Sequence, residues 1–262
     1  RRVLSNSSLL WSIHPPEGRT SFLFGTMHIR DERVYGYCDV LYPLIQQSDV
    51  YVGEMDLGEV PEHNEAPVYA MSAFFRAEVY EKLRNQIRKS FRLDILRFDH
   101  LHPLMIMSAI SHSMLENDRK VSLDEHLWNF ADRHQLTMQG LETLREQMAL
   151  LHSIAPDPLY RQIKEISTGP EKLRKFTRHS LDLYADGDIH RLYQLTKSSM
   201  HHLRKRIIYN RNLEMIKRIK SYDPSLGYFI AVGAGHLSGP TGIIGGLRAA
   251  GYKVKAMVPF NR

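Results

Sequence analysis

Two histidines follow a glycine at the same spacing, near opposite ends of the 262-residue chain. Gly25 precedes His28 in FLFGTMH, Gly233 precedes His236 in FIAVGAGH, and an apolar run comes before each pair. A glycine at the exit of a strand permits a sharp turn, so an imidazole three residues later can point back over the edge of the sheet. Gly235 allows a still closer approach of the backbone, and we predict that Gly25, Gly233 and Gly235 contact a bound cofactor.

Two glutamates also follow glycines at the ends of apolar runs. Glu54 comes directly after Gly53 in VYVGEMD, and Glu142 comes two residues after Gly140 in TMQGLET. In open α/β sheets the carboxyl ends of parallel strands line the crevice in which ligands bind. We therefore expect two histidines and two glutamates, far apart in the sequence, to converge at one edge of a sheet.

This set of side chains is suited to a divalent metal. Neutral imidazole and carboxylate bind such ions, and two histidines with one carboxylate leave positions open for water and substrate. The pattern predicts that His28, His236 and Glu54 are the ligands of Mn, Co or Zn. Such a metal lowers the pKa of bound water from about 16 towards 7, which makes the water a usable nucleophile. Glu142 could accept its proton and pass it to the leaving group, and Glu54 and Glu142 could exchange roles.

Arg211 is a further candidate because of its place in a helical pattern over 189–221. Arg211 falls within an apolar stripe with spacings of three and four, so its side chain should face inward. That stripe consists of Met200, Leu203, Ile207, Ile208, Met215 and Ile219. An inward guanidinium needs a partner, which Glu54, Glu142 or a substrate carboxylate could provide. Two roles stay open for Arg211, a structural ion pair or stabilisation of an oxyanion, and an amide of a glycine turn could also fill the second role.

The elements that must position these residues belong to an α/β fold. Long stretches of helical period separate six short runs rich in β-forming residues, and strands joined by helical crossovers pair in a mainly parallel sheet. The six runs cover residues 9–13, 21–25, 49–54, 136–141, 228–233 and 253–258. Two helix-rich segments, about 66–134 and 157–221, are predicted to form a helical layer or lid. Because no Pro/Gly-rich linker is present, we predict a single domain over 1–262, with a mainly parallel central sheet flanked by helices.

Composition excludes several classes of protein. The net charge is +6, but basic and acidic residues are interleaved, and the densest basic stretch, 201–212, lies in a helical pattern without an aromatic stacking repeat. We therefore predict no nucleic-acid partner. No apolar run approaches the roughly 20 residues that span a bilayer. A single cysteine, Cys38, excludes an internal disulfide without deciding the compartment. The sequence opens at Arg1, so an exported or periplasmic protein whose signal peptide is absent from the given chain stays an open expectation.

The sequence resembles the TraB/PrgY/GumN family, which includes the Tiki metalloproteases. Paired Gly-x-x-His motifs are the signature of that family, and the long C-terminal match is the most specific part. The matching stretches are LLW at 9–11, FLFGTMHI at 22–29, GEMDL at 53–57, GLETLREQ at 140–147, RNLEM at 211–215 and VGAGHLSGPTGIIGGLRAAGYKV at 232–254. The resemblance implies a metal-dependent hydrolase with a fold like that of the erythromycin esterases and ChaN-like proteins.

The resemblance also implies roles for individual residues. By position, His28, Glu54 and His236 fall on conserved metal and catalytic residues of the family, and Glu142 and Arg211 fall on further family motifs. The chain departs from the family in one place, where the usual Glu-Arg-Asn is Asn210, Arg211 and Asn212.

The substrate class follows from the chemistry and from the resemblance together. A metal-activated water attacks a carbonyl compound such as a peptide or an ester, and the likeness to Tiki favours a peptide. A second hypothesis is a binding protein that sequesters a peptide signal, haem or a metal in the same pocket without turnover. In a third, the polar groups are a scaffold and satisfy one another. The sequence gives no prediction of the oligomeric state.

Overall fold

A computed structural model of the chain describes residues 7–59, 69–116, 118–199 and 203–257. The chain divides into two compact units. The first is formed by residues 1–59, 119–144 and 180–262, and the second by 60–118 and 145–179. The organisation as a single domain with helical inserts stays a prediction.

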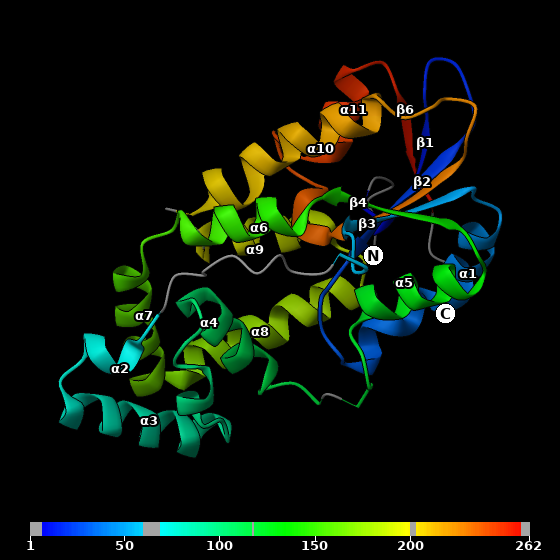
Figure 1. Cartoon of the computed structure of the whole chain (residues 1–262). Coiled ribbons are helices and arrows are strands. Elements are labelled where there is room, and N and C mark those ends of the chain that lie inside the picture. The colour runs from blue at the N-terminus through cyan, green and yellow to red at the C-terminus, as the bar shows by residue number, and fades with distance from the viewer. Residues whose placement is uncertain (1–6, 60–68, 117, 200–202, 258–262) are drawn as a thin grey trace. The chain divides into compact units, whose positions relative to one another are not determined.

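The first unit contains a mixed six-stranded sheet, which confirms the α/β class (Figure 1). Its strands are β1 Leu10–His14, β2 Ser21–Thr26, β3 Val50–Met55, β4 Thr137–Glu142, β5 Tyr228–Gly233 and β6 Lys253–Ala256, in the spatial order β4-β3-β5-β2-β1-β6. The four strands β4, β3, β5 and β2 are parallel, whereas β1 runs antiparallel to β2 and β6. The predicted strands agree with these bounds to within a residue, except that the last ends at Ala256; Val258 lies outside the described residues.

The central parallel strand β5 is apolar on both faces, as expected for a strand covered by helices on each side. Every residue of β5 from Tyr228 to Val232 is buried, and Phe229 at its centre is fully enclosed. The ring of Phe229 stacks on Tyr51 of β3 with 5.8 Å between the ring centres. This core fixes the register of the strands, and therefore fixes which residues reach the carboxyl edge.

Helices pack on both faces of the sheet. The helices α1 Cys38–Gln46 and α5 Leu123–Arg133 lie on one side, and α10 Arg211–Lys220 and α11 Ile243–Ala249 lie on the other (Figure 1). This division follows from right-handed crossovers, because the chain moves outward from β2 through β3 to β4 and then returns to β5.

The segment 189–221, predicted to be helical, contains three helical pieces in its described residues, 189–199 and 203–221. α9 covers Ile189–Ser199, a π-helical segment covers Lys205–Asn210, and α10 follows directly. Met215 and Ile219 of the predicted apolar stripe are buried. Met200 of that stripe lies outside the described residues.

The second unit is helical in its described residues. Its elements are α2 Met71–Phe74, α3 Ala77–Phe91, a 3-10 turn Ile95–Phe98, α4 Pro103–His112, most of α6 Leu144–His152, α7 Pro156–Thr168 and the first part of α8 Pro170–Ala185. Its core includes Leu83 and Ile87 of α3, Ile106 of α4 and Ile163 of α7. Within the described residues, no helix of either unit is long and apolar enough to cross a membrane.

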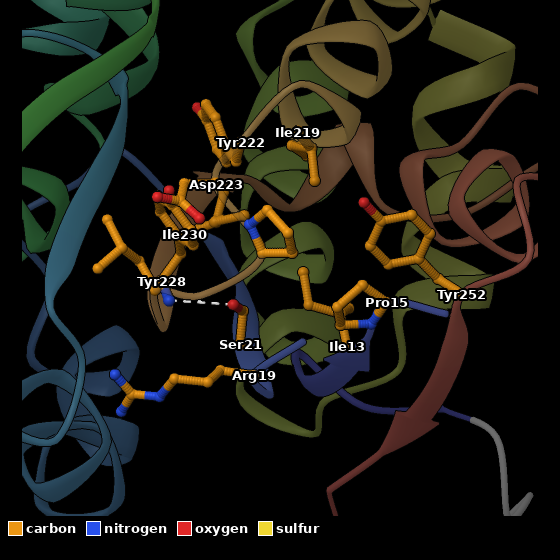
Figure 2. A pocket seen from close by; sticks show the side chains of 12 residues that line it. Ile13, Pro15, Arg19, Ser21, Ile219, Tyr222, Asp223, Tyr228, Ile230 and Tyr252 are labelled. Atoms are coloured by element: carbon orange, nitrogen blue, oxygen red, sulfur yellow. Dashed lines mark hydrogen bonds between the residues drawn. The ribbon is translucent and has the colours of Figure 1, made fainter. Parts of the chain in front are cut away.

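A small pocket of the first unit opens at the amino ends of β2 and β5 (Figure 2). Ser21 and Tyr228, the first residues of these strands, line it together with Ile13, Tyr222 and Tyr252. The hydroxyl of Ser21 accepts the amide N–H of Tyr228 at 3.0 Å. This lining is largely apolar and includes none of the predicted site residues, which belong to the opposite end of the same strands.

Candidate active site

The parallel pairing carries the predicted residues to one edge of the sheet. The registers Gly53 to Gly140 and Thr26 to Gly233 align the carboxyl ends of neighbouring strands. Glu142 closes β4, Glu54 lies near the end of β3, and each histidine follows its strand by two or three residues. The expectation that four strand ends meet at one edge is therefore confirmed by the order and direction of the strands.

Arg211 lies between the two glutamates at this edge. Its Nε and Nη2 donate to Glu142 at 2.8 and 2.6 Å, and Nη2 also donates to Oε1 of Glu54. The side chain is 14% exposed, which confirms the prediction that it faces inward. Burial opposes the charge of Arg211, but the two carboxylates raise its pKa, so the guanidinium is permanently charged.

Glu54 is held from two sides. Oε1 accepts from Arg211, and Oε2 accepts the amide N–H of Gly233 at 2.7 Å. Burial alone would raise the pKa of Glu54, but His236, Arg211 and the Gly233 amide lower it to about 2. Glu54 is therefore an ionised carboxylate at neutral pH.

His236 is buried, and Asn212 determines which of its ring nitrogens faces Glu54. The Nδ2 group of Asn212 donates to the carbonyls of His236 and Thr241 at 3.2 and 2.8 Å, so Oδ1 must face the ring. Nδ1 of His236 lies 2.6 Å from that oxygen and donates to it. Nε2 then carries a lone pair and lies 3.8 Å from Oε1 of Glu54. Burial lowers the pKa of His236, which keeps the ring neutral at pH 7.

His28 belongs to a second pair of side chains. Its Nδ1 lies 3.4 Å from Oδ2 of Asp124, in the first turn of α5, and the imidazole is largely exposed. The hydroxyl of Thr26 donates to the other oxygen of Asp124. Contact with Asp124 raises the pKa of His28, and the charge of Glu54 raises it further. Each Gly-x-x-His histidine thus has Nδ1 directed at a side-chain oxygen, which leaves Nε2 as its donor atom.

The donor set fits a divalent metal at two of the three predicted ligands. The 3.8 Å between Nε2 of His236 and Oε1 of Glu54 is less than two metal–ligand bonds of about 2.0–2.2 Å, so one ion can contact both atoms. The ring of His28 is not brought to the same point. Among the described residues, no three His, Cys, Asp or Glu side chains form a group arranged to hold a metal. Arg211 is one reason, because it binds both glutamates.

Comparison with known proteins identifies the family. The chain matches the TraB/PrgY/gumN family over residues 9–256. The chain belongs to this family. It is also similar to Metalloprotease TIKI1 of Danio rerio, with 23% identity over 314 aligned residues that cover 95% of this chain. The chain spans 63% of the length of that relative. No solved structure matches the chain.

The glycines of this TraB/PrgY/gumN chain serve close packing around the site. A Cβ atom at Gly25 would lie 2.6 Å from Cδ1 of Leu237, and one at Gly233 would lie 3.1 Å from Oε2 of Glu54. Gly235 is less restricted, because a Cβ there would meet Ile208 at an ordinary 3.8 Å. Contact of these glycines with a cofactor stays a prediction.

Two residues of the site were not found from the sequence. Asn212 belongs to the Arg-Asn pair of a family motif, and this motif could have indicated its role. Asp124 had no signal of its own, because nothing in the sequence connects the first turn of α5 with His28. Both residues come from helices beside the sheet and direct the histidine rings that follow its strands.

Proposed function

We propose that the chain is a metal-dependent hydrolase that acts on peptides. The observation that carries the proposal is the contact between His236 and Glu54. Asn212 holds the ring so that the Nε2 lone pair faces an ionised carboxylate at 3.8 Å. Two electron-rich atoms facing each other in a buried place favour a cation between them. The name of the TIKI1 relative supports the reaction class, and peptide as the substrate rests on that likeness alone.

In this proposal His236 and Glu54 hold the metal, and His28 supplies a further nitrogen. The exposed ring of His28 is directed by Asp124 through Nδ1, so its Nε2 is the atom that can bind. A bound divalent metal would polarise the substrate carbonyl and lower the pKa of water towards about 7.

The remaining residues divide the other tasks. Both oxygens of Glu142 accept N–H groups of Arg211, so Glu142 holds the guanidinium in place. Arg211 then offers positive charge to the oxyanion that forms when the carbonyl is attacked. Glu142, the carboxylate that does not hold the metal, would take up the proton of the attacking water and pass it to the leaving group once its ion pair with Arg211 opens, and Glu54 and Glu142 could exchange these roles.

The experiment measures metal content and metal-dependent cleavage in the same preparation. The purified protein is analysed for bound metals and incubated with a mixed peptide library, with and without Mn, Co or Zn. We expect cleavage that depends on metal, is abolished in His236→Ala and is reduced strongly in His28→Ala. The control is His134→Ala, which removes an exposed histidine of the same unit. Absence of metal-dependent cleavage in the wild type would overturn the proposal.

A second candidate function is a binding protein that retains a peptide, haem or a metal without turnover. It is favoured by the ion pairs of Arg211, which already gives both glutamates a cationic partner without a metal. The same experiment separates the two functions. Retention of a ligand by the wild type without any product supports the binding protein.

A further inference from the structure

Arg204 is a buried cation for which the described residues supply no acidic partner. It directly precedes the π-helical segment Lys205–Asn210, and the residue is 5% exposed. Its guanidinium lies 4.3 Å from the ring centre of Tyr193 and 5.6 Å from that of Tyr209, and Nε donates to the hydroxyl of Tyr209 at 3.1 Å. Within the part of the chain that the structure describes, no carboxylate forms an ion pair with Arg204.

The remaining donors of Arg204 form no hydrogen bond with the described residues. A guanidinium has five N–H donors, and Tyr209 accepts from one of them. The described side-chain atoms that are both wholly enclosed and without a hydrogen bond are Oη of Tyr80 and Oδ2 of Asp124. The terminal nitrogens of Arg204 are not in that group, so the described residues do not enclose them completely. Two aromatic rings therefore hold a charged fork whose terminal donors have no hydrogen-bond partner among the described residues, an arrangement that matches a carboxylate.

Arg204 is connected to the turn that carries His236. The ring of Tyr193 lies over Gly239, where an added Cβ would come within 2.1 Å of it, three residues after the histidine. Arg211 follows Arg204 by seven residues, at the end of the π-helical segment Lys205–Asn210. At the rise of an α-helix, about 1.5 Å per residue, this is at most roughly 10 Å along the axis. An extended peptide covers that distance in about three residues of about 3.3 Å each.

We infer that Arg204, held between Tyr193 and Tyr209, binds a carboxylate of a peptide ligand of the candidate site. The carboxylate is either the C-terminus of the peptide or the side chain of an acidic residue. The ligand class rests on the proposed function, and a carboxylate at Arg204 would lie about three residues from the carbonyl that is attacked. The anion site itself requires no metal.

The test is peptide binding to metal-free protein, so that hydrolysis does not enter the result. The probe is a randomised library of N-acetylated hexapeptides without acidic residues, made once with a free C-terminal carboxylate and once as the amide. A third form is the amide with one glutamate at a random position. Each library is passed over immobilised protein, and mass spectrometry measures the retained fraction. A preference for the first form identifies the C-terminus as the ligand, and a preference for the third identifies a side chain.

We expect the wild type to retain carboxylate-bearing peptides about tenfold better than neutral amides, as for a charge-assisted forked contact. Arg204→Met should abolish this preference, and Arg204→Lys, which keeps the charge but not the fork, should reduce it. The matched control is Lys205→Gln, which removes one exposed positive charge from the neighbouring position and should leave the preference unchanged. Circular dichroism checks that each variant folds, and the comparison of acid with amide in the wild type needs no variant.

Equal retention of acids and amides by the wild type would overturn the inference. An unchanged preference in folded Arg204→Met would overturn it as well. Failure of the proposed function gives a different result. A carboxylate preference without metal-dependent cleavage would support the anion site and contradict the proposed hydrolase. Metal-dependent cleavage without a carboxylate preference would support the hydrolase and contradict the anion site.

Discussion

Oδ1 of Asn212 lies 2.6 Å from Nδ1 of His236, and this contact decides which nitrogen of the ring faces Glu54. Asn212 is fully buried and uses its amide group to hold two backbone carbonyls as well. The helix α10 therefore determines the chemistry of a histidine that follows a strand 24 residues later in the sequence. A change at Asn212 should alter the site without removing any of its predicted ligands.

We predict that Asn212→Leu loses about 1–3 kcal/mol of stability, because Nδ1 and the carbonyl of His236 and the carbonyl of Thr241 lose their hydrogen bonds. Urea unfolding measures this loss. If the proposed metal site is correct, metal affinity should also fall by about 10–100-fold, as for other groups that orient a ligating histidine. Asn210→Ala is the control, since Asn210 is exposed on the preceding turn. Equal effects of the two substitutions would contradict the role of Asn212.

Removal of the guanidinium between the glutamates should be costly. Arg211→Met leaves Glu54 and Glu142 as neighbouring, mostly buried carboxylates without their cation, and we expect a loss of about 3–5 kcal/mol in the free energy of unfolding at pH 7. Addition of Glu142→Gln to this variant should recover part of the loss, because one of the two like charges is removed. Urea unfolding of the single and double variants measures both effects. No recovery in the double variant would contradict the charge argument.

Stability should rise with pH through the range in which an unfolded histidine titrates. Burial lowers the pKa of His236 below 6.5, so the unfolded chain binds a proton at this residue more readily than the folded protein. The contribution of His236 is thus present above pH 6.5 and is lost as the pH falls below it. Urea unfolding between pH 7.5 and 5.5 should give a shallower slope for His236→Gln, by up to about 1.4 kcal/mol per pH unit. If the free energy of unfolding changed with pH equally in His236→Gln and in the wild type, the predicted contribution of His236 would be wrong.

Three glycine substitutions should differ in cost according to the space around each Cβ. At Gly140 the added atom would lie 2.3 Å from the backbone nitrogen of Asp56, at Gly25 2.6 Å from the end of the Leu237 side chain, and at Gly235 3.8 Å from Ile208. We expect alanine to cost most at Gly140, about 1–3 kcal/mol at Gly25, where a side chain can move, and least at Gly235. Thermal unfolding ranks the three variants. If alanine at Gly235 destabilised the protein as much as alanine at Gly140, the space around each Cβ would not determine the loss of stability.

The sequence predicted the sheet and its functional edge well, and for a physical reason. Apolar runs that end in glycine mark both where a strand stops and where the backbone must pass close to its neighbours. The inward direction of Arg211 followed from helical spacing in the same way. These sequence patterns are local. They therefore predict which strand or helix carries a residue and whether the residue lies at the end of that strand or helix.

The rest of the site depends on contacts between distant parts of the chain. The contact of His28 with Asp124 joins a loop after β2 to the first turn of α5, 96 residues apart, and no spacing rule encodes it. The predicted three-residue metal group is not preformed among the described residues, where His28 contacts Asp124 and Arg211 binds both glutamates. The π-helical segment before Arg211 was likewise not predicted, since its residues have an ordinary helical pattern.

The position of β5 between β3 and β2 has a consequence for how the protein is made. A nascent chain that has emerged only as far as residue 227 holds β2 and β3 with no strand to join them, and each presents an unpaired edge. Such edges pair readily with other chains. The last 35 residues therefore complete the sheet in the middle through β5 and also extend it at one edge through β6. A truncation before Tyr228 should yield an aggregating product instead of a smaller stable one.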